Sequence, residues 1–356
     1  MVVLVSSHRP AVKLLLKSIV FSLGLLGILW VTGAVLSPGF GSSNPWPAVA
    51  ATRNEADVLA LGSSHTYCTV LPMELWRDNG VTALDVSGSA QILPVTEEYL
   101  AEALKMQHPR VVMLEVYMLG KQYSPAERVR INRAHVSLDC MPLGLPRLKG
   151  IVASVGPEHW GELVFPLQAY HSRWANLRGE DFGLQKDHKY SYARGAQYAS
   201  GTVSAAGPAA YDQVDEVAYT DDLPAIRRIA ARCEKDHIQL VLYRTPATRT
   251  MRVGKLPVME RLRSDLSSDF PSVRYLDLNL VSDELGLDSM KDYKDDWGHL
   301  NYGGAVKVSS WLADYLVREY GLADHRADSL AAKWNADLRI YDSQFQSSGQ
   351  VPTTDN

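Results

Sequence analysis

Short apolar runs and longer amphipathic runs follow one another in a regular order along residues 56–117. Short runs that are apolar throughout are typical of strands buried on both faces, and longer amphipathic runs are typical of the helices that cover them. We expect strands at residues 58–61, 81–86 and 110–117, and helices at residues 72–79 and 95–106. Strands and helices in this order predict an α/β fold built on a parallel sheet.

The same alternation returns after residue 220. We expect helices at residues 221–235, 256–266 and 303–320, and strands at residues 237–243 and 273–278. Together the two stretches predict a flavodoxin-like three-layer α/β/α sandwich with a parallel sheet of about five strands. We assign this domain to residues 56–322.

Residues 121–220 interrupt the pattern with scattered prolines and a patch rich in Gly, Ala and Ser. We treat them as an insertion and keep two interpretations of their aromatic side chains open. Either these side chains pack the small core of a partly helical insertion, or they form a lid that stacks on a sugar ring or an acyl donor. The aromatic and basic segment His171-Ser172-Arg173-Trp174 belongs to these residues, and its spacing does not distinguish the two interpretations. Residues 323–356 form a C-terminal extension whose polar end, from Ser343, is expected to be disordered.

Near the N-terminus, the nineteen uncharged residues 18–36 follow Arg9, Lys13 and Lys17. An apolar stretch of this length spans a bilayer core of about 30 Å. The basic segment 1–17 favours a cytoplasmic N-terminus, and residues 37–55 are typical of a linker. A cleaved signal peptide is the alternative, since Thr32-Gly33-Ala34 and Val49-Ala50-Ala51 offer cleavage sites. In either case the domain is expected outside the cytoplasmic membrane, and an uncleaved helix makes the chain a single-pass membrane protein.

The composition excludes several classes of function. A net charge of −4 argues against a nucleic-acid partner. The three cysteines, Cys68, Cys140 and Cys233, lack the spacing of zinc or redox motifs, and an odd number leaves at least one thiol unpaired. No group of His, Asp or Glu has metal-ligand spacing, and no glycine-rich phosphate loop follows an expected strand. We therefore expect neither a metal nor a cofactor.

Two segments far apart in the chain carry residue types suited to nucleophilic catalysis. Gly62-Ser63-Ser64-His65 follows the first expected strand, where open α/β sheets hold their ligands, and Asp296-Trp297-Gly298-His299 lies near the end of the domain. A serine hydroxyl needs a base to remove its proton, and the base needs a third group that fixes its tautomer. We expect Ser64 as nucleophile, His299 as general base and acid, and Asp296 as the group that orients His299. Ser63 and Asp295 are the alternatives for the first and third roles.

These two segments resemble the first and last sequence blocks of the SGNH (GDSL-type) hydrolases. In that family Gly-Asp-Ser carries the nucleophile, and Asp-x-x-His carries the other two members of the triad. Ser63 stands in place of the usual aspartate, as in the membrane-anchored D-alanyl-transfer proteins of the teichoic acid pathway. The longer stretch 61–76, together with 296–301, is similar to bacterial membrane-anchored SGNH proteins associated with membrane-bound O-acyltransferases.

The resemblance implies an oxyanion hole formed by the backbone N–H groups of Ser64 and Gly88. The family's third donor, an Asn after the third strand, has no counterpart, because Glu115-Val116-Tyr117 occupies that position. The side chain of His65 is expected to point away from the nucleophile, toward the lid or solvent. We name His65, Arg173 and Trp174 as candidate substrate-binding residues.

For function, the resemblance implies a membrane-anchored, extracytoplasmic enzyme that transfers an acyl group to a cell-envelope glycan or polymer through an acyl-Ser64 intermediate. The expected partners are the lipid bilayer, a membrane-bound O-acyltransferase that hands over the acyl group, and the glycan acceptor. The absent third donor favours transfer, because acyl-transferring members of the family also depart from that block. Two alternatives stay open: an SGNH esterase or deacetylase that uses water as acceptor, and a non-catalytic assembly partner of the O-acyltransferase.

Overall fold

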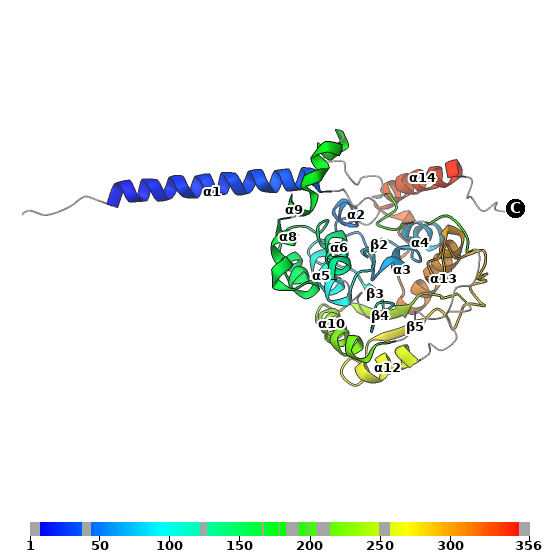
Figure 1. Cartoon of the computed structure of the whole chain (residues 1–356). Coiled ribbons are helices and arrows are strands. Elements are labelled where there is room, and N and C mark those ends of the chain that lie inside the picture. The colour runs from blue at the N-terminus through cyan, green and yellow to red at the C-terminus, as the bar shows by residue number, and fades with distance from the viewer. Residues whose placement is uncertain are drawn as a thin grey trace, which may run out of the picture.

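The computed structural model describes residues 8–37, 44–121, 127–165, 167–177, 179–182, 192–197, 199–203, 214–248 and 257–348. Within these ranges five strands form a parallel sheet in the order β2-β1-β3-β4-β5 (Figure 1). The strands are β1 (Val58–Leu61), β2 (Ala83–Asp85), β3 (Val111–Glu115), β4 (Gln239–Arg244) and β5 (Arg274–Asp277). The predicted α/β class and the parallel sheet are confirmed.

Both faces of the sheet are buried, which explains why its inner strands are largely apolar. In β1, Leu59 and Leu61 join an apolar cluster that contains residues of α5 and α10. Val58 and Ala60 join a second cluster that contains residues of α4 and α13. The period of two along the strand therefore sends alternate side chains into separate cores. The helices that pack around the sheet are α4 (Pro72–Asn79), α5 (Leu93–Ala103), α10 (Glu216–Lys235), α12 (Pro257–Leu266) and α13 (Tyr302–Tyr320).

Residues at the helix ends account for where α4 and α13 begin and end. Pro72 starts α4, at a position where an N–H would have no partner within the helix. Gly80 ends the helix in the left-handed conformation. The side chain of Asn301 precedes α13 and accepts the N–H of Gly304 at 3.1 Å. Because the loop before α13 carries candidate catalytic residues, this N-cap also fixes one end of that loop.

The N-terminal helix α1 (His8–Leu36) projects from the domain, and its C-terminal end packs on it (Figure 1). It contacts α9 (Leu167–Tyr170) and the 3-10 helices η3 (His171–Asn176) and η4 (Gly179–Phe182). Its segment Ala11–Leu36 has a mean hydropathy of 2.3. By length and composition, this one helix of the described chain can cross a membrane. A short helix, α2 (Trp46–Ala51), follows it.

The described part of the insertion contains short helices that pack beside α5. These are α6 (Glu127–Leu138), α7 (Leu145–Ser154), η2 (Pro157–His159) and α8 (Trp160–Val164), followed by α9, η3 and η4. α7 packs on α5, and α6 packs on α7. Further along, the N–H of Gln197 donates to the carbonyl of Tyr67 at 3.1 Å, so this later part of the insertion lies near the end of the sheet that follows β1.

The C-terminal extension folds back onto the domain as η6 (His325–Ala327) and α14 (Ala331–Ser348). Trp334 of α14 is fully buried, with its ring centroid 5.3 Å from that of Trp76 and the guanidinium carbon of Arg194 4.2 Å from its ring. The expected disorder from Ser343 is wrong as far as residue 348, because buried aromatic residues hold α14 and the helix continues through its polar end. Residues 349–356 lie outside the described ranges.

Candidate active site

The turn after β1 places Ser64 at the start of a short helix, α3 (Ser64–Tyr67). Gly62 in this turn has a φ of +143°, a conformation that favours glycine. A Cβ atom on Gly62 would lie only 2.6 Å from Cβ of Glu115 at the end of β3. Since β1 lies between β2 and β3, this turn is at the switch point of the sheet, where open α/β sheets bind ligands.

Ser64 and His299 meet across the carboxyl end of the sheet. The hydroxyl oxygen of Ser64 lies 2.7 Å from Nε2 of His299. On the other side of the ring, Nδ1 lies 2.9 Å from Oδ2 and 3.0 Å from Oδ1 of Asp295. An Nδ1–H that donates to this carboxylate leaves Nε2 as an acceptor for the Ser64 proton. The His299 and Asp295 side chains are 17% and 27% exposed, so both are accessible from solvent.

The carboxylate beside His299 belongs to Asp295, whereas the sequence pattern pointed to Asp296. The N–H of Lys294 donates to the carbonyl of His299 at 2.8 Å and closes the loop as a tight hairpin. Oδ1 of Asp295 accepts the N–H of Trp297 at 3.1 Å and that of His299 at 3.3 Å. These bonds turn Asp295 toward the imidazole and leave Asp296 exposed. The prediction of Asp296 was therefore wrong. The hydrogen bonds within the hairpin, and not the spacing in the sequence, place the carboxylate of Asp295 beside His299.

The ionisation of Asp295 suits this position. Partial burial acts to raise its pKa, but the hydrogen bonds and the charge of His299 outweigh burial, and the pKa lies below the ordinary value. The carboxylate therefore keeps its charge at neutral pH. A charged carboxylate can fix the tautomer of His299 and stabilise the imidazolium that forms when the ring takes a proton.

Ser63 faces away from His299 and holds the turn together. Its side chain is buried, and its hydroxyl donates to Oε2 of Glu115 at 2.8 Å. Its own N–H points to the same oxygen at 3.3 Å, and its hydroxyl oxygen accepts the N–H of His65 at 3.3 Å. Ser63 thus caps α3. Of the two adjacent serines, Ser64 is the one whose hydroxyl meets the imidazole.

Glu115 is a buried acid, and in the sequence it stands out only as a departure from the SGNH pattern. It is 1% exposed and accepts hydrogen bonds from Ser63 and from the N–H of Tyr117. Burial raises the pKa of Glu115 to about 7, although these hydrogen bonds and the charge of Arg244 act to lower it. An acid at the end of an apolar strand was the signal that could have identified it.

His65 lies inside the site rather than facing solvent. The residue is 3% exposed, and its ring stacks on Tyr117 and on His299, with centroids 3.6 Å and 4.4 Å apart. Its Nδ1 lies 3.5 Å from Oγ1 of Thr245, which follows β4. The expectation that His65 points away was wrong, because residues after β3 and β4 enclose the ring. The stack instead restricts the plane of the His299 ring.

The two expected oxyanion donors differ in their surroundings. The N–H of Gly88 donates to the carbonyl of Gly62 at 3.2 Å, so the nucleophile turn already engages it. An oxyanion can use Gly88 only by displacing that carbonyl. The N–H of Ser64 is at the first residue of α3, where helices leave their N–H groups without an intrahelical partner.

Tyr67 is a further hydroxyl at the site, and sequence reasoning missed it. Its side chain is buried, and the side chains of Ser89 and Ser64 lie close enough to act to lower its pKa. Burial, followed by the neighbouring Cys68, raises the pKa of Tyr67 to about 12, so the phenol keeps its proton at neutral pH. The spacing of three residues from Ser64 on one helical turn was the available signal.

Arg173 and Trp174 lie at the junction with α1, outside this site. The guanidinium of Arg173 donates to the carbonyl of Leu36 at 2.6 Å and to Oδ1 of Asp181 at 2.9 Å. Trp174 is 72% exposed. The insertion packs this segment on α1. The expected role of both residues in binding substrate stays a prediction. Arg173 places its positive charge at the C-terminus of α1, which stabilises a helix end.

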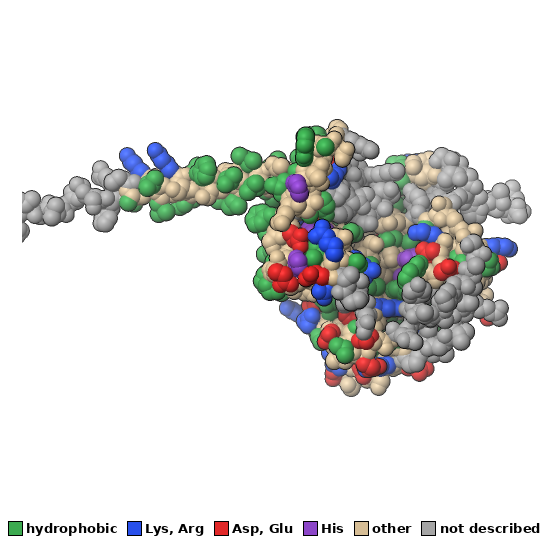
Figure 2. Space-filling view, viewed as in Figure 1, with side chains coloured by type: hydrophobic (Ala, Val, Ile, Leu, Met, Phe, Trp, Pro, Cys, Tyr) green, Lys and Arg blue, Asp and Glu red, His purple; other side chains and the backbone are tan. Residues whose placement is uncertain are grey.

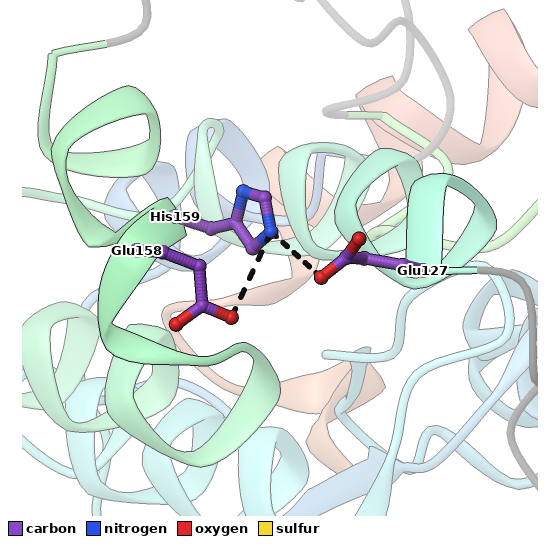
Figure 3. Close-up of side chains that lie close together, drawn as sticks. All are labelled: Glu127, Glu158 and His159. Carbon is purple, nitrogen blue, oxygen red and sulfur yellow. Dashed lines mark hydrogen bonds and ion pairs between the residues drawn. The ribbon is translucent and has the colours of Figure 1, made fainter.

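One group of metal-ligand residue types occurs in the described chain: Glu127, Glu158 and His159 (Figure 3). Nε2 of His159 lies 3.0 Å from Glu127 and 3.9 Å from Glu158, and Nδ1 lies 2.8 Å from Glu162. The hydrogen bond with Glu127 is the first cause of the raised pKa of His159. Both drawn glutamates are exposed, so we interpret the group as a surface ion-pair cluster that joins α6 to η2 and α8.

None of the three cysteines, Cys68, Cys140 and Cys233, forms a disulfide bond in the structure. Burial raises the pKa of the Cys68 and Cys233 thiols to about 12. A thiol that keeps its proton is a poor nucleophile. Cys68, although close to Ser64 in sequence, therefore does not compete with it.

Comparison with known proteins gives no relative for this chain. No family model matches it, and neither the curated proteins nor the solved structures yield a significant match. The site is therefore interpreted from its own geometry.

Proposed function

We propose that this protein is a serine acyl-ester enzyme in which Ser64 is the nucleophile, His299 the general base and acid, and Asp295 the orienting carboxylate. The observation that supports this most strongly is the pair of contacts on one imidazole. Nε2 lies 2.7 Å from the Ser64 hydroxyl oxygen, and Nδ1 lies 2.9 Å from Asp295. Hydroxyl, imidazole and carboxylate in this order form the triad that recurs in serine hydrolases on unrelated folds.

The proposed reaction has two halves. Ser64 attacks the carbonyl carbon of an acyl donor while His299 Nε2 takes its proton, and His299 then gives that proton to the leaving group. This leaves an acyl-Ser64 ester. In the second half, His299 removes a proton from an acceptor hydroxyl, which attacks the ester carbonyl, and the proton returns to Ser64 as the acyl group leaves.

Charge on the tetrahedral oxygen needs donors that are in place beforehand. The N–H of Ser64 is one, and we assign the hydroxyl of Tyr67 as another, in place of the Asn that the SGNH pattern expects. Its place on α3, three residues after Ser64 and close to the side chains of Ser64 and Ser89, supports this assignment. Loss of a single donor costs about 10²–10³ in rate where it has been measured, so Tyr67→Phe should fall in that range.

The fold is proposed to be a flavodoxin-like three-layer sandwich of the SGNH type. Two observations support this arrangement. The strand order β2-β1-β3-β4-β5 is that of flavodoxin-like sheets. Alternate side chains of β1 enter two separate cores formed with different helices, as a sheet between two helical layers requires.

We propose that α1 is an uncleaved anchor with a cytoplasmic N-terminus and an extracytoplasmic domain. Lys13 and Lys17 lie near its start, which is the side that stays in the cytoplasm under the positive-inside rule. The hydrogen bond from Arg173 to the carbonyl of Leu36 ties the end of α1 to the domain, and this favours a helix that remains attached.

Anchoring favours an acceptor that is presented at the membrane, such as a cell-envelope glycan or polymer. A membrane-bound O-acyltransferase is the proposed source of the acyl group. On this proposal the acyl-Ser64 ester is resolved by a sugar hydroxyl. If water resolves it instead, the protein is an esterase or deacetylase of the same fold. Product analysis with and without a glycan acceptor distinguishes the two outcomes.

The nucleophile assignment has a direct test. A fluorophosphonate probe should label the wild-type protein and fail to label Ser64→Ala. The matched control is Ser63→Ala, which changes the adjacent hydroxyl that donates to Glu115 and should still be labelled. Labelling of Ser64→Ala at the wild-type level contradicts the assignment.

A second candidate function is a non-catalytic assembly partner of the O-acyltransferase. The engagement of the Gly88 N–H by Gly62 favours it, because one expected oxyanion donor is occupied. This candidate predicts that Ser64→Ala fully complements a deletion of the gene. The enzyme proposal predicts that it does not.

A further inference from the structure

Helix α7 exposes an apolar stripe on the surface of the domain. Leu145, Leu148 and Val152 are 65%, 46% and 56% exposed. Their spacing of three and four residues places them on one face of the helix. The opposite face, with Gly150 and Ile151, is buried. The stripe is therefore a helix face that no described part of this chain covers.

The segments that flank α7 and α8 reach the apolar surface of α1. Leu143, just before α7, and Phe165, just after α8, are 55% and 49% exposed. Both line a hollow of about 290 Å³ together with Leu29 and Trp30 of α1. Hydrophobic side chains accordingly extend from α1 onto the adjoining edge of the domain (Figure 2). The apolar surface of the helix thus continues toward the stripe.

The charges on α7 itself also suit a lipid surface. α7 contains no acidic residue, and Lys149 is the charged residue that it exposes. An apolar helix face flanked by a basic residue is typical of helices that lie in the membrane interface, where anionic headgroups attract Lys and Arg. Trp174, exposed at the junction with α1, is of a residue type enriched at that depth.

We propose that the α7 stripe (Leu145, Leu148 and Val152) is a second lipid contact, which lies in the interface of the bilayer that α1 crosses. The inference rests on the proposed anchoring by α1. Because the guanidinium of Arg173 donates to the carbonyl of Leu36, the end of α1 is tied to the domain, and a second contact fixes the tilt of the domain against the membrane. The Ser64 site is then held in one orientation to substrates at the bilayer surface.

The test uses the full chain in nanodiscs of phosphatidylcholine and phosphatidylglycerol. Leu148→Cys carries an environment-sensitive fluorophore, and the same lipids with brominated acyl chains act as the quencher. Val20→Cys in α1 reports insertion of the anchor. Leu280→Cys, on an equally apolar and 73% exposed position after β5, is the matched control. The protein without an added cysteine gives the background from the native thiols.

The proposal predicts loss of emission at residues 148 and 20 in brominated nanodiscs and none at residue 280. Quenching at residue 20 without quenching at residue 148 overturns the second contact while leaving the anchor intact. A blue-shifted but unquenched probe at residue 148 also overturns it, because a protein rather than lipid then covers the stripe. An unquenched probe at residue 20 removes the anchor itself, and the inference with it, without affecting the chemistry assigned to Ser64.

Discussion

The imidazole of His65 stacks on that of His299, with ring centroids 4.4 Å apart and planes inclined by 21°. Tyr117 stacks on the other side of His65 at 3.6 Å. The stacked rings of His65 and Tyr117 therefore support His299, the base of the proposed triad, in addition to its contacts with Ser64 and Asp295. Residues adjacent in sequence to the nucleophile thus help to position its base.

Removing the His65 ring from this stack should reduce turnover without unfolding the protein. His65→Ala frees the ring of His299 to tilt, and a misplacement of about 1 Å costs about 10²-fold in rate. We expect kcat to fall while KM changes little. His65→Phe keeps a flat ring in the stack and should recover much of the loss. Steady-state kinetics on an aryl ester measures both variants, and equal losses in the two would contradict a stacking role.

The two neighbouring aspartates should respond differently to the same substitution. Asp295→Asn keeps the shape but removes the charge beside Nδ1, and the corresponding change in a serine-protease triad lowers kcat about 10⁴-fold. Asp296 is exposed, so Asp296→Asn should keep near wild-type activity. The measurement is kcat of both variants, and Asp296→Asn is the matched control for Asp295→Asn. A larger loss of kcat in Asp296→Asn than in Asp295→Asn would show that Asp296, as the sequence motif indicated, orients His299.

Local sequence predicted the elements of the sheet closely. The helix expected at residues 72–79 forms at Pro72–Asn79, and each expected strand forms within a few residues of its predicted bounds. These signals are local, because Pro and Gly end helices and a doubly buried strand is apolar throughout. The helix expected at residues 221–235 begins earlier, at Glu216, where Asp215 accepts the N–H of Ala218 at 2.8 Å as the N-cap.

The details of the site could not be predicted in the same way. Asp295 and Asp296 are both within reach of His299 by spacing, and a hairpin bond between Lys294 and His299 selects between them. The position of His65 depends on Tyr117 and on a residue after β4, both far away in sequence. Such long-range contacts leave no periodic signal in the chain.

Buried acids should make the protein less stable as the pH rises. Burial raises the pKa of Asp85 to about 8 and that of Glu115 to about 7. Between their ordinary values and these raised values the folded state holds protons that the unfolded state has released. The free energy of unfolding therefore falls through this window, by at most about 1.4 kcal/mol per pH unit for each group.

Urea unfolding between pH 5 and 8 measures this slope. Asp85→Asn keeps the oxygen that accepts the N–H and hydroxyl of Ser87, and it removes one titrating group. We expect a shallower dependence of the unfolding free energy on pH in this variant. A slope identical to that of the wild type would show that Asp85 does not hold its proton in the folded state.

The nucleophile turn should not tolerate a side chain at Gly62. An alanine there has a strained φ of +143° and a Cβ 2.6 Å from both Glu115 Cβ and Thr66 Oγ1. We expect Gly62→Ala to lower stability by about 1–3 kcal/mol and to abolish activity, because the turn must shift. Gly321→Ala is the matched control: its φ is +59° and no atom lies within 4 Å of the added Cβ. It should lose about 1 kcal/mol and keep its activity, as chemical denaturation and ester turnover can show.

The most direct test of the proposed chemistry is the site and rate of covalent modification by a fluorophosphonate, read by peptide mass spectrometry. We expect a single adduct on the Ser64 hydroxyl that forms at least about 10³-fold more slowly in His299→Ala, because the base that removes the serine proton is then missing. An adduct on another residue, or a rate on Ser64 that does not depend on His299, would contradict it.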